Sequence, residues 1–153
     1  MSSPRSFEPQ DPDFEARVRA SFARQRFMST LGAKLARVAA GEVDIDLAER
    51  DELTQQHGFL HAGALAAVAD SACGYAALSL MPAGAAVLSV EFKINLLAPA
   101  GGDHVVARGR VIRAGRTVTV CWGEVAAHTG TEERLVATMV GTMMTVRDRG
   151  LAD

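Results

Sequence analysis

The sequence predicts one α+β domain in which a strongly curved antiparallel β-sheet wraps around a long central helix. Residues 61–80 are apolar on nearly every side, which is typical of a helix that is buried all round. Four strand-like segments with short connections follow this helix, and short connections favour antiparallel pairing over parallel βαβ units. A length of 153 residues fits a single domain with its own core.

The N-terminal part of the chain predicts a tail and then an amphipathic helix. Residues 1–10 contain two prolines and several serines, and we expect them to be a disordered tail. The segment Asp11-Pro12-Asp13 has the composition of a helix start, with acidic residues and a proline in the first turn. Apolar residues then recur at helical spacing as far as residue 27, and Gly32 ends the helix. These residues are Phe14, Val18, Phe22 and Phe27.

The strands are predicted from alternating apolar residues and turn signals. Residues 34–39 and 42–47 form a hairpin around Ala40-Gly41, and a loop covers residues 48–60. After the central helix, strands are expected at residues 87–97, 103–113, 116–128 and 135–146, followed by a tail at 148–153. The domain therefore spans residues 11–147. In the strand 87–97 one face is expected to carry Leu88, Val90, Phe92, Ile94 and Leu96, and the other Ser89, Glu91, Lys93 and Asn95.

The composition argues against several classes of function. The chain is 48% hydrophobic and 22% charged with a net charge of −2, so nothing in its charge favours binding to nucleic acid. The longest apolar stretch contains a carboxylate and several glycines, so we do not expect it to span a membrane. The first residues lack the apolar core of a signal peptide, so we expect a cytoplasmic protein. Cys73 and Cys121 are far apart and are expected to be buried and inert, and the histidines show no convincing metal-binding spacing.

Asp70 is the most informative residue of the chain. It carries the only formal charge between Leu53 and Val90, among side chains that are small, apolar or uncharged. An ionised group is costly in such surroundings unless it is paired or used. The sequence therefore indicates either a structural carboxylate that a distant segment satisfies, or a functional group in a cavity.

The segment 55–63, QQHGFLHAG, resembles a motif of the PaaI-like acyl-CoA thioesterases of the hotdog-fold superfamily, in which His-Gly-Gly opens the central helix and an acid follows nine residues after the His. Here His61 and Asp70 have that spacing. The sequence departs from the pattern at Gln55, where the family often has Asn, and at Ala62, where it often has Gly. Further likeness lies in the segments 89–92, 97–100 and 110–116, so the resemblance covers roughly residues 33–146.

The resemblance implies a thioester hydrolase, and we expect neither a metal nor another cofactor. Asp70 would be the general base or the nucleophile, and the backbone N–H groups of Ala62 and Gly63 at the helix start would polarise the thioester carbonyl. His61 would orient this turn or contact the thioester, and Gln55 would bind the carbonyl or the attacking water. Ser89 would help to position that water near Asp70.

The resemblance also implies partners for this chain. Coenzyme A carries phosphates, and the candidates to bind them are Arg110, Arg113 and Arg116 around the turn at residues 114–115. The site would be built across a homodimer, which would assemble further into a homotetramer, and the strand 87–97 could serve as the pairing edge. The acyl group is expected to be medium-chain or aromatic. The alternatives are a hotdog hydratase or dehydratase acting on acyl thioesters, and a non-catalytic acyl-CoA binding module.

Overall fold

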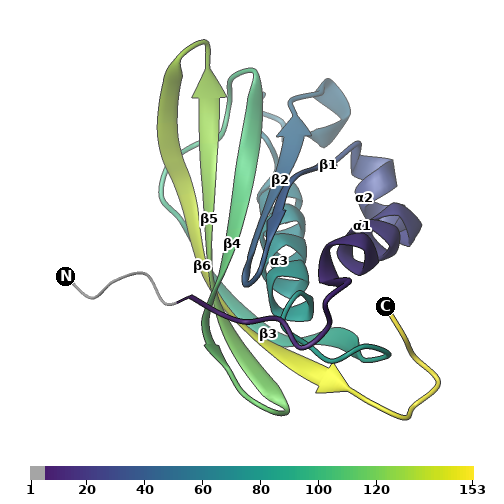
Figure 1. Ribbon diagram of the computed structural model, residues 1–153. Coiled ribbons are helices and arrows are strands. Elements are labelled where there is room, and N and C mark those ends of the chain that lie inside the picture. The colour runs from purple at the N-terminus through teal and green to yellow at the C-terminus, as the bar shows by residue number, and fades with distance from the viewer. Residues whose placement is uncertain (1–5) are drawn as a thin grey trace.

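A curved antiparallel sheet surrounds one long helix in the computed structural model, which describes residues 6–153 (Figure 1). Six strands are hydrogen-bonded in the order β1-β2-β4-β5-β6-β3. The predicted fold class is confirmed. The strands are β1 (Lys34–Ala39), β2 (Glu42–Ala48), β3 (Ala86–Leu96), β4 (His104–Ala114), β5 (Val118–Thr129) and β6 (Glu132–Val146); the helices are α1 (Phe14–Arg24), α2 (Arg26–Leu31), the short 3-10 turn η1 (Asp51–Leu53) and α3 (Ala62–Leu78).

The central helix α3 packs unusually close to the sheet. From Ala64 onward most of its side chains are buried, and many of them are alanine. Two glycines of the facing strands allow this approach: a Cβ atom at Gly109 of β4 would lie 2.3 Å from the backbone of Ala72, and one at Gly123 of β5 would lie 3.0 Å from Cys73 Sγ. Small residues on both sides therefore fix the position of the helix that carries Asp70.

The N-terminal helix differs from its prediction. It ends at Arg24, because Gln25 has an extended backbone (φ −77°, ψ 98°), and α2 starts in a new direction at Arg26. The break turns Met28 and Leu31 into the core and leaves Phe27 56% exposed. The prediction that Phe27 continues the apolar face of one helix is therefore wrong. A change of helix direction explains why one continuous helical period could not account for residues 14–31.

Arg17 ties α1 to the C-terminal end of α3. Its guanidinium donates hydrogen bonds to the carbonyl oxygens of Leu78, Met81 and Pro82 at 2.6–2.8 Å and lies 3.3 Å from a carboxylate oxygen of Asp11. The last carbonyl groups of a helix have no partner within the helix, and a cation there is favourable. This contact holds the N-terminal helices over the side of α3 that the sheet does not cover (Figure 1).

Strand β3 forms an edge of the sheet and contains a bulge. It pairs only with β6, and its register shifts between Ser89, which faces Met143, and Glu91, which faces Thr142. Val90 is therefore an extra residue, and the alternation predicted for the whole strand is wrong across it. The bulge places Ser89 on the same face as Phe92, which is the face toward α3, while Glu91 lies on the opposite face.

Both ends of the described chain contact the domain. The predicted tail 1–10 has its first five residues outside the described part; in the remainder Phe7 packs against the core and Gln10 donates a hydrogen bond to the Leu80 carbonyl at 3.0 Å. At the other end Asp153 accepts hydrogen bonds from Ser21 and from the backbone of Val87, both at 2.8 Å. Within residues 6–153 no helix has the length and apolar character needed to cross a membrane.

Candidate active site

Asp70 lies on α3, half-buried, where its carboxylate accepts a hydrogen bond of 2.7 Å from the Ser89 hydroxyl. No Lys, Arg or His of the described residues forms an ion pair with it. Burial raises the pKa of Asp70 above its ordinary value of 3.8, and the hydrogen bond from Ser89 opposes part of this shift. A carboxylate with a raised pKa is a better acceptor of a proton from water, so the surroundings of Asp70 suit a general base.

The bulge in β3 is what brings Ser89 to Asp70. Sequence reasoning placed Ser89 on the polar face with Glu91 and Lys93, but the hydroxyl points toward α3 and also lies 3.4 Å from Met143 Sδ. Asp70 and Ser89 share a cavity of about 330 Å³ beside α3. Other residues of its wall come from the break between α1 and α2, from Tyr75 and from the C-terminal segment, and sequence reasoning missed them. No local motif marks them, because they meet only through packing.

The start of α3 offers one free backbone donor. His61 is the N-cap, with an extended backbone, and its Nδ1 accepts a hydrogen bond of 2.8 Å from the Gly63 N–H. A neutral imidazole that accepts at Nδ1 carries its proton on Nε2. Gly63 is therefore already engaged. The N–H of Ala62, the first helical residue, has no acceptor among residues 6–153, and it lies at the positive end of the helix dipole.

A tight turn before α3 positions Gln55. Its N–H donates to the Phe59 carbonyl at 2.8 Å, and its side-chain oxygen accepts a hydrogen bond from the His57 N–H. Gln55, His61 and Ala62 line a second cavity of about 650 Å³, whose opposite wall is the segment 96–100. Phe59, from the turn before α3, and Leu97, from the opposite wall, have exposed apolar side chains that line this cavity.

The predicted catalytic residues thus fall into two groups within one chain. Asp70 and Ser89 line the first cavity, and Gln55, His61 and Ala62 line the second. Asp70 follows Ala62 by eight positions in α3, which corresponds to about 12 Å along the helix axis. A base and an oxyanion donor that act on one carbonyl group must both lie within about 3 Å of the reacting atoms, so the two groups of one chain cannot act together.

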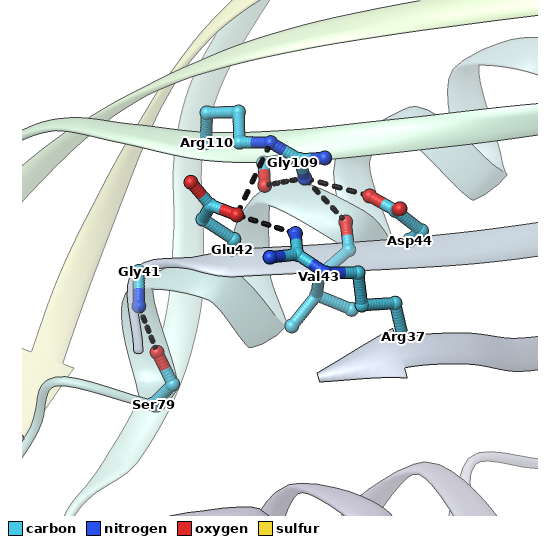
Figure 2. A network of polar contacts seen from close by, with 8 residues as sticks. All are labelled: Arg37, Gly41, Glu42, Val43, Asp44, Ser79, Gly109 and Arg110. Atoms are coloured by element: carbon cyan, nitrogen blue, oxygen red, sulfur yellow. Dashed lines mark hydrogen bonds and ion pairs between the residues drawn. The ribbon is translucent and has the colours of Figure 1, made fainter. Parts of the chain in front are cut away.

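The three candidate arginines have different surroundings. Arg110 lies in a network on β2 and β4, where its guanidinium is 2.6 Å from Asp44 and 3.9 Å from Glu42, which also pairs with Arg37 (Figure 2). Its charge is already compensated, and it lines neither of the two cavities. Arg113 and Arg116 are exposed at the turn between β4 and β5. The structure therefore does not support Arg110 as a phosphate ligand.

Comparison with known proteins places this chain in a family. The sequence profile of the thioesterase superfamily matches residues 57–134, about half of the chain, and this range contains Asp70, Ser89, His61 and Ala62 but not Gln55. The chain belongs to the thioesterase superfamily. The predicted hotdog fold and the predicted membership among thioesterases are confirmed at this level.

Two solved structures and two curated relatives of this thioesterase are informative. A thioesterase family protein from Silicibacter pomeroyi is 49% identical, with a TM-score of 0.86 over 88% of this chain and 98% of that one. The Escherichia coli PaaI protein is 21% identical and shares the fold, with a TM-score of 0.80 over 90% and 96% of the two chains. Presumed esterases of Saccharolobus solfataricus and Halobacterium salinarum are each 32% identical, over 59% and 61% of this chain; the matches span 64% of the length of each relative.

Proposed function

We propose that this thioesterase hydrolyses acyl-CoA to the free acid and coenzyme A, with Asp70 as its general base. The observation that carries the proposal is the half-buried carboxylate, without a cation beside it, that faces a cavity and is held by the Ser89 hydroxyl. Asp70 takes a proton from a water molecule, and the water oxygen forms a bond to the thioester carbonyl carbon. The tetrahedral intermediate then collapses, the C–S bond breaks, and the thiolate of coenzyme A takes up a proton.

The backbone N–H of Ala62 is the proposed donor to the oxyanion. It has no acceptor within the described part of the chain, and it lies at the N-terminal end of a 17-residue helix, where the dipole favours negative charge. His61 holds the turn in place, because its Nδ1 accepts the Gly63 N–H and so fixes the orientation of the first helical residues. Gln55 lies on the wall of the same cavity, where its amide can bind the attacking water or the carbonyl group.

Two copies of the chain are needed to complete this site. The distance of about 12 Å along α3 separates Asp70 from Ala62 in one chain, so the donor must come from a second copy. Strand β3, whose outer edge is open, borders both cavities. Its residue Ser89 lines the first cavity, and its residue Leu96 lines the second. Pairing of two β3 edges across a two-fold axis would bring each first cavity to the second cavity of the partner. A dimer of such dimers remains part of the proposal.

Coenzyme A would reach the site through the apolar second cavity. The exposed guanidinium groups of Arg113 and Arg116 are the candidates for its phosphates, since neither has an ion pair among the described residues. Arg110 has no part in this proposal. The acyl group would extend from the thioester into the space beside Asp70.

The test is release of free thiol from a panel of acyl-CoAs by the wild type and by Asp70→Asn. The panel runs from short to long chains and includes phenylacetyl-CoA and benzoyl-CoA. The amide keeps the shape and the acceptor for Ser89 but is no base, so we expect a loss in kcat of about 10²- to 10⁴-fold. Asp153→Asn, a second carboxylate of the same cavity wall, is the matched control for a general effect of charge.

Each other outcome contradicts a defined part of the proposal. Equal hydrolysis by the wild type and by Asp70→Asn would place the chemistry on other residues. A change in enoyl absorbance without thiol release would indicate a hydratase or dehydratase. Saturable binding of acyl-CoA without any turnover would indicate a binding module.

A further inference from the structure

The cavity that contains Asp70 has a polar wall. Eight of its eleven lining residues carry a polar side chain, and the three others are Gly74, Val87 and Ala152. An acyl group made only of CH₂ and CH₃ groups would remove water from these polar groups without replacing its hydrogen bonds. The lining is therefore unlike that of a site for a plain alkyl chain.

Most of the polar groups in this wall already have partners. Ser89 donates to Asp70, and the Asp153 carboxylate accepts from the Ser21 hydroxyl and from the Val87 N–H. Gln25 is different. Its side-chain oxygen is buried, and no donor among residues 6–153 reaches it; its side-chain nitrogen lies 3.5 Å from Ser71 Oγ.

Rotating the Gln25 amide does not supply the missing hydrogen bond. Rotating the amide by 180° would let the Ser71 hydroxyl donate to the oxygen and would leave the nitrogen without an acceptor. In both orientations one buried polar atom of Gln25 lacks a partner among residues 6–153. Buried polar groups without a partner are few in folded proteins, and a polar group of a bound molecule is one way to satisfy them.

The break between α1 and α2 is what places Gln25 at the cavity. Gln25 is the single extended residue between the two helices, and its side chain reaches Ser71, the residue after Asp70 on α3. In one continuous helix Gln25 would have helical rather than extended backbone angles, and its side chain would point in a different direction. The backbone break and the unpartnered amide are thus two features of the same position.

The charged residues of the cavity wall restrict which acyl groups can bind there. Asp70 and Asp153 contribute two carboxylates and Arg24 one guanidinium, so an acyl group with its own carboxylate would meet a net negative wall. A neutral hydroxyl fits better, because it can donate a hydrogen bond to an amide oxygen or accept one from an amide nitrogen. The Tyr75 hydroxyl, 3.4 Å from Ser21 Oγ, offers a second polar contact in the same wall.

We propose that Gln25 is a specificity-determining residue that hydrogen-bonds a hydroxyl group on the acyl chain, so that the preferred substrates are short hydroxyacyl thioesters. This inference rests on the proposed thioesterase function. The cavity of about 330 Å³ has room for a short acyl chain and its hydroxyl. Gln25 acts through binding and leaves the proton transfer at Asp70 unchanged.

The test compares matched substrates that differ by one hydroxyl group: butyryl-CoA with 3-hydroxybutyryl-CoA and 4-hydroxybutyryl-CoA, and hexanoyl-CoA with 6-hydroxyhexanoyl-CoA. The enzymes are the wild type, Gln25→Met, which keeps the length of the side chain, and Arg26→Met, a neighbouring exposed position outside the cavity. Thermal unfolding and circular dichroism check that each variant is folded.

We expect the wild type to prefer at least one hydroxylated member in kcat/KM by about tenfold, the size of one well-placed hydrogen bond. Gln25→Met should lose that preference, because its kcat/KM falls about tenfold more on the hydroxylated member than on the unsubstituted partner, whereas Arg26→Met should keep it. Equal rates for both members of every pair, or an equal loss on both in Gln25→Met, would overturn the inference and leave the thioesterase function standing. Failure to hydrolyse any thioester would overturn the function and the inference together.

Discussion

The Asp70 carboxylate is half-buried on α3 and accepts a hydrogen bond from the Ser89 hydroxyl. Because burial raises its pKa in the folded protein, ionisation of Asp70 opposes folding: its contribution to stability is fully present below the ordinary value of 3.8 and is lost as the pH rises through the raised pKa. The same desolvation makes the carboxylate more basic. A cost in stability at neutral pH and suitability as a base therefore have a single physical cause.

The raised pKa of Asp70 predicts the pH dependence of activity. The base must be deprotonated, so kcat/KM should fall on the acid side around a pKa above 3.8. Ser89→Ala removes the hydrogen bond that lowers this pKa, and the acid limb should move to higher pH in that variant. Rates of thiol release measured from pH 4 to pH 9 check both statements. An acid limb at the same pH in both proteins would show that Ser89 does not stabilise the charged form of Asp70.

At the scale of elements, the contact between α3 and the sheet depends on two glycines. A Cβ atom at Gly109 would lie 2.3 Å from the Ala72 carbonyl group and 2.6 Å from the Cys73 nitrogen. These are backbone atoms of α3, which cannot move aside as a flexible side chain would. The close approach fixes the height of α3 above the sheet, and with it the position of Asp70 relative to Ser89.

Gly109→Ala should therefore lower the free energy of unfolding by about 1–3 kcal/mol, and by more if the backbone cannot shift. Gly74→Ala, in α3 itself, is the control, because an added Cβ meets nothing within 4 Å there and alanine favours the helix; we expect a gain of about 0.5–1 kcal/mol. Urea unfolding measures both. Equal stability of Gly109→Ala and the wild type would show that the helix is not held at this distance.

The elements and the family were predictable from the sequence, but two local irregularities were not. Alternating residues predicted every strand, and the apolar stretch that contains Asp70 predicted α3. The bulge at Val90 adds one residue without changing the apolar pattern of β3, so the face of Ser89 could not be read from that pattern. The break at Gln25 lies inside a helical pattern and results from packing of Met28 and Leu31 on the core.

The candidate site was predictable in its residues and only partly in its arrangement. Asp70 was found from its isolated charge and His61 from the resemblance to a thioesterase motif, but hydrogen bonds formed in the fold decide which neighbouring groups are free. Gly63 donates to His61, and Arg110 is paired with Asp44, so neither offers what the sequence suggested. Competition among polar groups for partners is a property of the folded chain.

At the scale of the whole molecule, β3 is the surface on which a second copy is expected. Its exposed apolar side chains include Leu88 at 51%, Val90 at 53% and Phe92 at 42%, on a strand whose outer edge is unpaired within the chain. Apolar edge strands of this kind pair with another chain or aggregate.

Val90→Asp should therefore convert a dimer or tetramer into a folded monomer of 16.2 kDa without thioesterase activity, because each copy would bring a charge into an otherwise apolar interface. Phe27→Asp, at a position 56% exposed on α2, should leave the assembly unchanged. Light scattering after gel filtration measures the mass of each. A monomeric wild type that is active would contradict the assembly proposed here.

The most direct test of the account uses two inactive variants that damage different halves of the site. Asp70→Asn removes the base. Ala62→Pro removes the oxyanion donor and should preserve the helix, because proline suits the first helical position and His61 already has the extended backbone that a following proline requires (φ −63°, ψ 139°). Ala62→Gly keeps the N–H and should remain active.

We predict that co-expression of Asp70→Asn and Ala62→Pro, followed by purification of the mixed dimer population, restores about one quarter of the wild-type rate of thiol release. Half of the dimers would then contain both chains, and one of the two sites in each of them would have an intact Asp70 facing an intact Ala62 N–H. No recovery from a mixture that demonstrably contains mixed dimers would contradict a site shared between two copies of the chain.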